Sequence, residues 1–220
     1  MIGDLRAEAM SLNLKNFKIC VVDDSTDETK KIAAECGAEV VSGPGTGLGG
    51  AYLSGTRFCL GFQPDVVVTL DGDGQVALSE LKLFLTPLMN GYDLVVGSRF
   101  LHDNKITYSY PTINHLGSKM LSGYLTAMTG QKLTDSHGGF RAMKADVLKN
   151  LHLKGTHTYV QETLIEASEA GFKILEIPSQ WLVRKHGGSR VVGSIPKYIK
   201  RVGPVLLKRL ARKIFFGKSR

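Results

Sequence analysis

Apolar runs and amphipathic stretches alternate along most of the chain. Short runs rich in Val, Ile and Leu predict strands, whereas longer stretches with apolar residues every third or fourth position predict helices. The predicted strands are residues 17–22, 38–41, 66–70, 93–96 and 172–177, with a possible edge strand at 180–183. The predicted helices are residues 4–14, 27–36, 49–60, 79–89, 113–128 and 160–170, and a further short element follows a turn-rich stretch at 145–151. This alternation predicts an α/β fold with a mostly parallel sheet covered by helices.

Length and composition suit one such domain. The chain has 220 residues, 43% of them hydrophobic, and its 25 glycines against 7 prolines are typical of many tight strand-to-helix turns. Cys20, Cys36 and Cys59 lack metal-ligand spacing, so we expect free thiols in a reducing compartment. The first residues lack the apolar core of a signal peptide, and no apolar run is long enough to span a membrane. We therefore expect a protein on the cytoplasmic side that does not itself cross a membrane.

The net charge of +8 is concentrated at the C-terminal end. Residues 191–220 contain nine Lys or Arg and no acid, whereas residues 1–190 contain 19 basic and 20 acidic residues. Apolar and basic positions take opposite sides of a helix predicted to start near Pro204. The apolar positions are Leu206, Leu207, Leu210, Ala211, Ile214 and Phe215, and the basic ones are Lys208, Arg209, Arg212 and Lys213. The chain is thus divided into a domain at 1–190 and a basic amphipathic helix within 191–220.

Two interpretations of this helix stay open. It suits the surface of an anionic membrane, where its apolar side would enter the headgroup boundary. The alternative is a terminal helix docked on the domain with its bases in water. Nucleic acid is disfavoured, because no aromatic-rich basic sheet or recognition motif accompanies the charge.

Closely spaced polar residues follow the predicted strand at 66–70. Asp71 and Asp73 stand on either side of Gly72, and Gln75 comes two residues later. Carboxylates two residues apart at a strand end can turn toward one site, and Mg²⁺ and Mn²⁺ prefer oxygen ligands. Taken alone, the spacing also suits a solvated acidic turn.

A second pair of acids, Asp23 and Asp24, follows the predicted strand at 17–22. Ligands of parallel sheets bind beyond the carboxyl ends of strands, where a carboxylate can accept hydrogen bonds from a nucleobase or ribose. The glycine-rich loop at 43–51 has the spacing of a dinucleotide fingerprint, but no acid ends a strand about 20 residues later. A loop around Gly47 that lets the backbone approach a nucleotide sugar is at least as good an interpretation.

Five motifs occur in order along the chain, at residues 21–29, 47–51, 71–75, 93–100 and 134–141. Together they resemble glycosyltransferase family 2 over residues 18–190, and in particular the dolichyl- and polyprenyl-phosphate hexosyltransferases. The resemblance implies a GT-A, Rossmann-like fold and a divalent metal, Mg²⁺ or Mn²⁺. It also implies transfer of a hexose, with inversion, from a nucleotide sugar to a polyprenyl or dolichyl phosphate. GDP-mannose is the first expected donor and UDP-glucose the second.

The site residues that the resemblance implies are acids and an amide that hold nucleoside and metal, and arginines that hold phosphate. The nucleoside and sugar side comprises Asp23, Asp24 and Gly47, and the metal side Asp71, Asp73 and Gln75. The remaining substrate contacts are Arg99, Asp135, Arg141 and a basic loop with Arg184, Ser189 and Arg190. The residues expected to act in catalysis are Asp73, Arg141, Arg184 and Arg190.

The acceptor decides whether a general base is needed. A phosphate brings an ionised nucleophilic oxygen, so it needs positioning by arginines more than proton removal. Transfer to a sugar hydroxyl would require a base, for which Glu162 is the candidate, although Glu162 also suits a helix-orienting role. A departing nucleoside diphosphate gathers negative charge that cations can stabilise.

The family ordinarily begins with a strand and a turn that complete the nucleotide pocket. Here a helix-like stretch at 4–14 precedes the first predicted strand. We therefore expect an N-terminally short domain with weakened donor binding. The opposing hypothesis is a non-catalytic relative that acts as a binding or membrane-recruited module, and a protein partner in the membrane is compatible with either.

Overall fold

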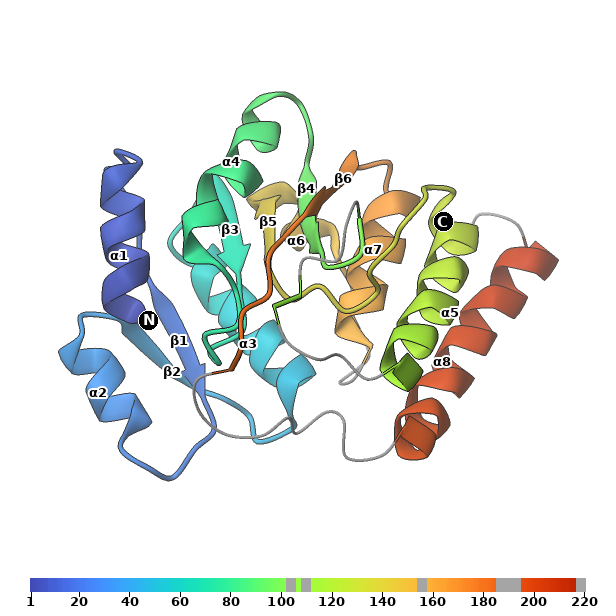
Figure 1. Cartoon of the computed structure of the whole chain (residues 1–220), viewed down its shortest axis with the longest axis horizontal. Helices are drawn as coiled ribbons and strands as arrows, with labels where there is room; N and C mark the ends of the chain where they lie inside the picture. Colours follow the sequence, from blue (N-terminus) through green and yellow to red (C-terminus); the bar gives the residue numbers. More distant parts are fainter. Residues whose placement is uncertain (102–105, 108–111, 154–157, 185–194, 217–220) are drawn as a thin grey trace.

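The structure, a computed structural model, describes residues 1–101, 106–107, 112–153, 158–184 and 195–216. Figure 1 shows a central sheet with helices on both sides, β1 and β2 at one end and α5 and α8 at the other. The strands are β1 (Cys20–Asp23), β2 (Glu39–Ser42), β3 (Val66–Thr69), β4 (Leu94–Ser98), β5 (Arg141–Lys144) and β6 (Ile174–Pro178). The helices are α1 (Ile2–Ser11), α2 (Thr29–Glu35), α3 (Leu48–Leu60), α4 (Leu81–Met89), α5 (Thr112–Thr129), α6 (Ala145–Asn150), α7 (Tyr159–Glu169) and α8 (Ile195–Phe216).

The strands form two sheets. β1 and β2 pair in parallel, and the larger sheet has the order β3-β5-β4-β6. β4 and β6 are parallel, whereas β5 runs antiparallel to both β3 and β4. Three of the four strands in the larger sheet therefore run the same way, which confirms the predicted α/β fold with a mostly parallel sheet.

Two strand predictions need correction. The sequence did not predict β5, because Arg141 and Lys144 at its ends interrupt any apolar run and only Ala142 and Met143 are apolar. Its place between β3 and β4 buries both of these residues. The possible edge strand at 180–183 is not a strand in the structure, where Trp181 makes only isolated bridges.

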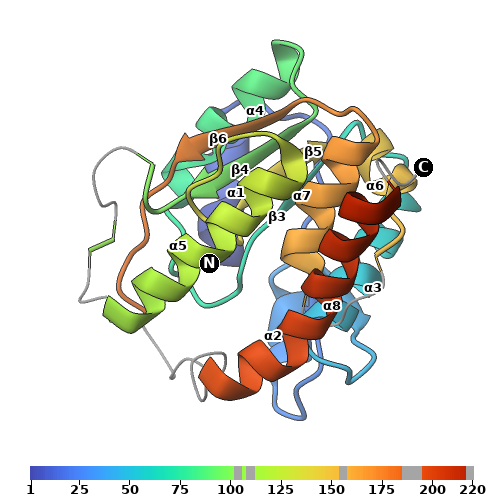
Figure 2. The same ribbon diagram turned by 90° about the vertical axis from the view of Figure 1, so that its right-hand side faces the viewer.

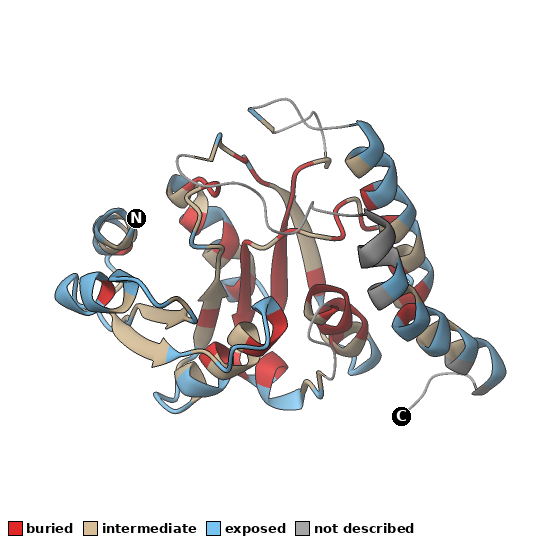
Figure 3. Ribbon diagram, turned by 90° about the horizontal axis from the view of Figure 1, so that it is seen from below, coloured by how far each residue is buried: buried red, intermediate tan, exposed pale blue. Residues whose placement is uncertain are grey.

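Apolar side chains cover both faces of the larger sheet. Leu94 and Val96 of β4 belong to one core cluster, with α5 and α7, and Val95 between them belongs to a second cluster, with α4. This alternation follows from the two-residue period of a strand. In the second cluster the rings of Phe84 and Phe140 stack with centroids 3.8 Å apart. Figure 3 shows the strands of this sheet largely buried, while the outer surfaces of the helices are exposed.

Helix α8 is docked on the domain beside α5, as Figure 2 shows. The hydroxyl of Tyr124 on α5 donates to the backbone carbonyl of Leu206 at 2.9 Å. Arg209 donates to Glu166 of α7 at 2.6 Å, and Lys213 donates to backbone carbonyls at the end of α5. Docking is thus observed, and no described helix is long and apolar enough to cross a membrane.

The division of α8 into an apolar and a basic side differs from the prediction. Arg209 and Lys213 turn toward the domain, where carboxylates and free carbonyl groups accept their hydrogen bonds. Leu207, Ile214 and Phe215 instead point outward and are exposed. The helical period alone could not identify the docked side, because both sides offered plausible contacts.

Candidate active site

The candidate site lies where the carboxyl ends of β3 and β4 meet the first residue of β5. Because β5 runs antiparallel, Arg141 pairs with Thr69 at the end of β3 and with Val96 near the end of β4. The segment that precedes β5 therefore lies at the same edge as the acidic turn after β3. The fold brings together two motifs about 65 residues apart in the sequence.

Asp71 lies near one further acid and three arginines of the site. Burial and the charge of Asp73 raise the pKa of Asp71 above its usual value. Three cationic side chains oppose this rise, namely Arg141, Arg184 and Arg99. The fold therefore brings these predicted acids and arginines within electrostatic range of one another.

Asp73 and Gln75 share a cationic partner. Arg184 Nη2 donates to Asp73 Oδ2 at 2.7 Å and to Gln75 Oε1 at 3.1 Å. The backbone N–H of Gln75 donates to Asp73 Oδ1 at 3.0 Å, and the side-chain amide of Gln75 donates to the carbonyl of Leu182 at 3.2 Å. These bonds direct two oxygen atoms toward one positive charge.

The residues present fit a divalent metal. No group of three or more His, Cys, Asp or Glu side chains suited to a metal occurs within the described residues. Mg²⁺, however, commonly takes one or two protein carboxylates together with water and substrate phosphates. Asp71, Asp73 and Gln75 supply hard oxygen donors, and Arg184 already places a cation against two of them.

Arg99 and Asp135 form a buried ion pair. Arg99 donates through Nε and Nη2 to the two carboxylate oxygens of Asp135 at 2.7 and 2.8 Å, and its backbone N–H adds a third bond at 3.1 Å. Burial alone would raise the pKa of Asp135, but the charge and hydrogen bonds of Arg99 hold this pKa below its usual value. The Arg99 guanidinium also lies 4.8 Å from the ring centroid of Trp181. Arg99 and Asp135 thus form one rigid unit.

Arg141 is bonded to the segment before it, which contains Gly138 and Gly139. Arg141 is buried, and its Nε donates to the carbonyl of Gly138 at 2.8 Å. A Cβ on Gly138 would lie 2.1 Å from the carbonyl oxygen of Gly97, and one on Gly139 would lie 2.3 Å from a carboxylate oxygen of Asp71. The absence of side chains at both positions lets this segment approach β4 and the acidic residues after β3.

The predicted nucleoside side is built around β1. Asp23 accepts hydrogen bonds from the backbone N–H and hydroxyl of Ser25, at 3.2 and 2.7 Å. Asp24 accepts a bond from the backbone N–H of Gly45 at 3.0 Å, which ties the glycine-rich loop to the end of β1. Gly47 has a φ of +86°, which favours glycine, and directly precedes α3.

Glu162, the candidate general base, lies buried among hydrogen-bonding and ionic partners. Its side chain is fully buried and accepts a hydrogen bond from the Thr158 hydroxyl at 2.5 Å. An ion pair of 3.8 Å links it to Arg209 of α8. These partners favour the helix-orienting interpretation.

Sequence reasoning missed two residues that hold the 134–141 motif. The carboxylate of Glu176 on β6 accepts hydrogen bonds from the backbone N–H groups of Thr134 and Asp135 at 2.9 Å. Gln161 on α7 donates to the carbonyl of Ser136 at 2.9 Å. The available signal for Glu176 was one acid inside the apolar run at 172–177.

His137 is kept neutral within the same motif. Its Nδ1 lies 2.8 Å from the hydroxyl of Ser136, and burial lowers the pKa of His137 to about 4. Ser189 and Arg190, which the sequence predicted as phosphate contacts, lie outside the described residues, as does His186.

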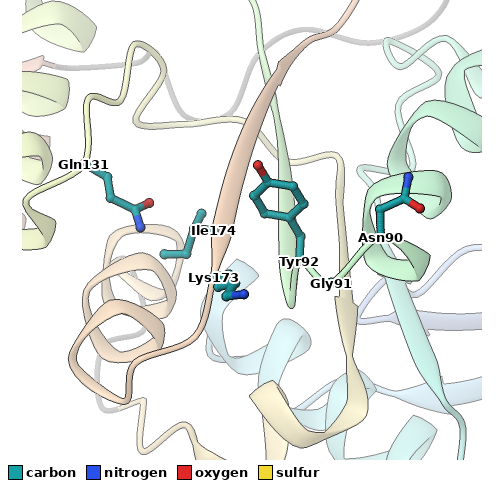
Figure 4. A pocket seen from close by; sticks show the side chains of 6 residues that line it. All are labelled: Asn90, Gly91, Tyr92, Gln131, Lys173 and Ile174. Carbon is teal, nitrogen blue, oxygen red and sulfur yellow. The ribbon is translucent and has the colours of Figure 1, made fainter.

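A hollow at the other end of the sheet is separate from this site. Figure 4 shows it between Tyr92, which precedes β4, and Lys173, which precedes β6. It therefore lies at the amino ends of these strands, away from Asp71 and Arg141.

Comparison with solved structures defines the class of fold. Glucosyl-3-phosphoglycerate synthase from Mycobacterium tuberculosis, solved in complex with Mn²⁺, UDP and glucosyl-3-phosphoglycerate, matches with a TM-score of 0.61 and 19% sequence identity. The match covers 95% of this chain and 84% of that chain. The protein has the GT-A fold.

Comparison of sequences then defines the family. The model of glycosyl transferase family 2 matches residues 4–151. An uncharacterized protein of Methanocaldococcus jannaschii is 31% identical over 221 residues, which cover 98% of this chain and 88% of that protein. The undecaprenyl-phosphate mannosyltransferase of Micrococcus luteus is 35% identical over 154 residues, which cover 68% of this chain and 62% of that enzyme. The chain belongs to glycosyl transferase family 2 and is a hexosyltransferase.

Proposed function

We propose that this enzyme transfers a hexose, with inversion, from a nucleotide sugar to a polyprenyl or dolichyl phosphate. The observation that carries the proposal is the meeting of the Asp71 and Asp73 turn with Arg99, Arg141 and Arg184 at one edge of the sheet. Acids suit a metal-bound diphosphate, and arginines suit phosphate groups on either substrate. GDP-mannose is the first donor to test and UDP-glucose the second.

The donor side stabilises a departing nucleoside diphosphate. A bound Mg²⁺ or Mn²⁺ would neutralise charge on the leaving diphosphate, which is worth several kcal/mol. Asp71, Asp73 and Gln75 would hold this ion, and Asp23 and Asp24 would accept hydrogen bonds from the nucleoside. Arg184 would turn from Asp73 toward the diphosphate, and Ser189 and Arg190 would add contacts to the same group.

The acceptor side positions an oxygen that is already ionised. The Arg99–Asp135 pair and the buried Arg141 anchor residues 134–141 through hydrogen bonds. An acceptor phosphate placed here needs orientation more than a general base. The burial of Glu162 and its pairing with Arg209 weigh against transfer to a hydroxyl acceptor.

The comparison with a relative supports a lipid phosphate as acceptor. The Micrococcus luteus relative is named as a transferase acting on undecaprenyl phosphate. The basic C-terminal segment would hold this chain at the cytoplasmic face of a membrane, where such an acceptor is found. A membrane protein partner is compatible with this placement.

The test is transfer of radiolabelled sugar from GDP-mannose or UDP-glucose to a short polyprenyl phosphate, with and without Mn²⁺ or Mg²⁺. Asp73→Ala should remove the metal-dependent lipid-linked product, because it takes away a ligand and the partner of Arg184. Asp65→Ala is the matched control, since Asp65 is exposed at the opposite end of β3. Transfer to a sugar hydroxyl but not to lipid phosphate would contradict the proposed acceptor. No product and no nucleotide binding would favour a non-catalytic relative.

A further inference from the structure

Two cysteines that are far apart in the sequence lie on neighbouring elements of the fold. Cys20 begins β1, and Cys59 lies in the last turn of α3. Helix α3 packs on β1, beside which Figure 1 shows it. Neither thiol belongs to the candidate active site, which lies at the ends of β3 and β4.

Contacts on either side of the two cysteines show how α3 is aligned with β1. Before β1, the ammonium group of Lys18 lies 4.4 Å from the centroid of the Phe62 ring, just beyond the end of α3. Within β1, Val22 lies so close to α3 that a Cβ on Gly55 would be 2.6 Å from its Cγ2 atom. The strand and the helix therefore run in opposite directions along their shared interface.

The spacing along both elements places Cys20 opposite Cys59. Cys20 precedes Val22 by two residues, a step of about 6.6 Å that returns to the same face of a strand. Cys59 follows Gly55 by four residues, a step of about 6 Å that likewise returns to the same face of a helix. Because the elements run in opposite directions, these two matching steps lead from one observed contact to the two thiols.

The two thiols also interact directly. A hydrogen bond with Cys59, together with burial, raises the pKa of Cys20, whereas the same bond lowers the pKa of Cys59 against the effect of burial. Two charged neighbours act on Cys20 in opposite senses, since Glu39 raises its pKa and Lys18 lowers it. Cys20 thus donates its S–H to the sulfur of Cys59, which is the sulfur that more readily becomes a thiolate.

The surroundings of the pair suit oxidation. Cys20 and Cys59 are half-buried, so neither sulfur is fully enclosed by the core. Redox-sensing cysteines combine thiolate character and access to solvent with a second thiol nearby. A disulfide requires two Cα atoms within about 7 Å of each other, and the absence of a side chain at Gly55 lets α3 lie close to β1.

We propose that Cys20 and Cys59 form a site of reversible oxidation, which a peroxide converts to a disulfide. The Cys59 thiolate attacks one peroxide oxygen and breaks the O–O bond, so that Cys59 becomes a sulfenic acid and the other oxygen takes a proton and leaves. The sulfur of Cys20 then gives up its proton, attacks Cys59 Sγ and displaces the hydroxyl group as water. The peroxide thereby accepts two electrons, and a thiol reductant restores both thiols.

The disulfide would restrain the unfolded chain and the donor side of the domain. It closes a loop between residues 20 and 59, so the oxidised protein should resist denaturant better than the reduced protein. It would also join the strand that ends at Asp23 to the helix that follows Gly47. A restraint on the nucleoside site rests on the proposed function, whereas formation of the disulfide does not.

The first experiment treats the full chain with hydrogen peroxide, blocks the remaining thiols with N-ethylmaleimide and maps tryptic peptides by mass spectrometry without reduction. Trypsin places the three cysteines in separate peptides, at residues 19–30, 32–57 and 58–82. Peptides 19–30 and 58–82 should appear as one linked species that dithiothreitol separates, and the peptide with Cys36 should stay unlinked. Two peptides that stay separate, or linkage through Cys36, would overturn the proposal.

A second measurement identifies the attacking sulfur. In Cys20→Ser the sulfenic acid of Cys59 has no second thiol to resolve it, so dimedone added with peroxide should label Cys59. In Cys59→Ser the same treatment should leave Cys20 unlabelled. Equal labelling of the two variants would contradict the assignment of Cys59 as the attacking sulfur.

The effect on stability is tested in the same variants. Peroxide should raise the midpoint of urea unfolding of the wild type, and dithiothreitol should reverse the change. Cys36→Ser is the matched control and should respond like the wild type, since Cys36 is exposed and lies on neither element. Cys20→Ser and Cys59→Ser should show no rise, and a rise in either of them equal to that of the wild type would overturn the proposal.

Failure of this inference is distinguishable from failure of the proposed function, because none of these measurements uses a nucleotide sugar or an acceptor. A linked peptide in a protein that transfers no sugar would support the oxidation site and contradict the proposed function. Sugar transfer to lipid phosphate by a protein that forms no linked peptide would do the reverse.

Discussion

At the scale of single residues, Arg184 occupies the place where the proposed function puts a metal ion. Its guanidinium bonds to oxygens of both Asp73 and Gln75. A divalent ion must compete with this internal cation before it can use the same oxygens. The oxygens of Asp73 and Gln75 already point toward one position when no metal is bound. This lowers the free energy needed to arrange them around an ion.

Arg184→Ala should therefore bind Mn²⁺ more tightly than the wild type when nucleotide is absent, as measured by the electron paramagnetic resonance of free Mn²⁺. The same variant should lose roughly 100-fold in kcat, because a cation directed at the leaving diphosphate is missing. Arg57→Ala is the control, since Arg57 is exposed in the last turn of α3. Weaker Mn²⁺ binding by Arg184→Ala would mean that Arg184 supports the metal site instead of competing for it.

The sequence indicated which residue types occur near the site, but not which of these residues bond to one another. Asp71 and Asp73 could be found because both directly follow an apolar strand. The pairing of Arg99 with Asp135 could not, because it joins two segments that only meet once β4 and β5 are paired. The role of Glu176 was hidden for the same reason, since its partners lie about 40 residues earlier.

At the scale of elements, the docking of α8 depends on buried charge. Arg209 donates to Glu166 and lies 3.8 Å from Glu162, which is fully buried on α7. A buried carboxylate that loses a cationic neighbour is costly. The contact thus links the C-terminal helix to an element that also supports the 134–141 motif through Gln161.

Arg209→Ala should loosen α8 and reduce the free energy of unfolding by about 1–3 kcal/mol, because hydrogen bonds to charged groups are lost. Hydrogen exchange of the α8 amides should accelerate, and chemical denaturation should give the change in free energy. Lys208→Ala, one residue away and exposed, should leave both unchanged. Equal exchange in the two variants would show that apolar contacts around Leu206 hold the helix.

At the scale of the whole molecule, the free energy of unfolding should depend on the protonation of His137. The pKa of His137 is about 4 in the folded protein and about 6.5 in the unfolded chain. As pH falls from about 6.5 to about 4, the unfolded chain takes up a proton that folded His137 does not. This residue therefore lowers the stability by at most about 1.4 kcal/mol per pH unit in that window and has no effect at higher pH.

His137→Asn should reduce the slope of stability against pH between about 6.5 and 4, measured by denaturant unfolding at a series of pH values. The wild type and the variant must be compared because Asp71, whose pKa is raised by folding, increases the stability as pH falls. Asp135, whose pKa is lowered by folding, reduces the stability only in the more acidic range, below the pKa that an aspartate has in the unfolded chain. His152→Asn alters an exposed histidine and should leave the slope as it is. An unchanged slope in His137→Asn would contradict a neutral His137.

The sequence alone determined the α/β class, most element positions and the family, because each depends on local periodicity or on motifs of a few residues. The order β3-β5-β4-β6 came only from the tertiary structure, since a polar strand such as β5 becomes a strand through its neighbours. The docked side of α8 was decided in the same way, because Glu166 and the end of α5 supply partners that lie far away in the sequence. Local patterns specify what each segment can form, and only long-range contacts select which groups meet.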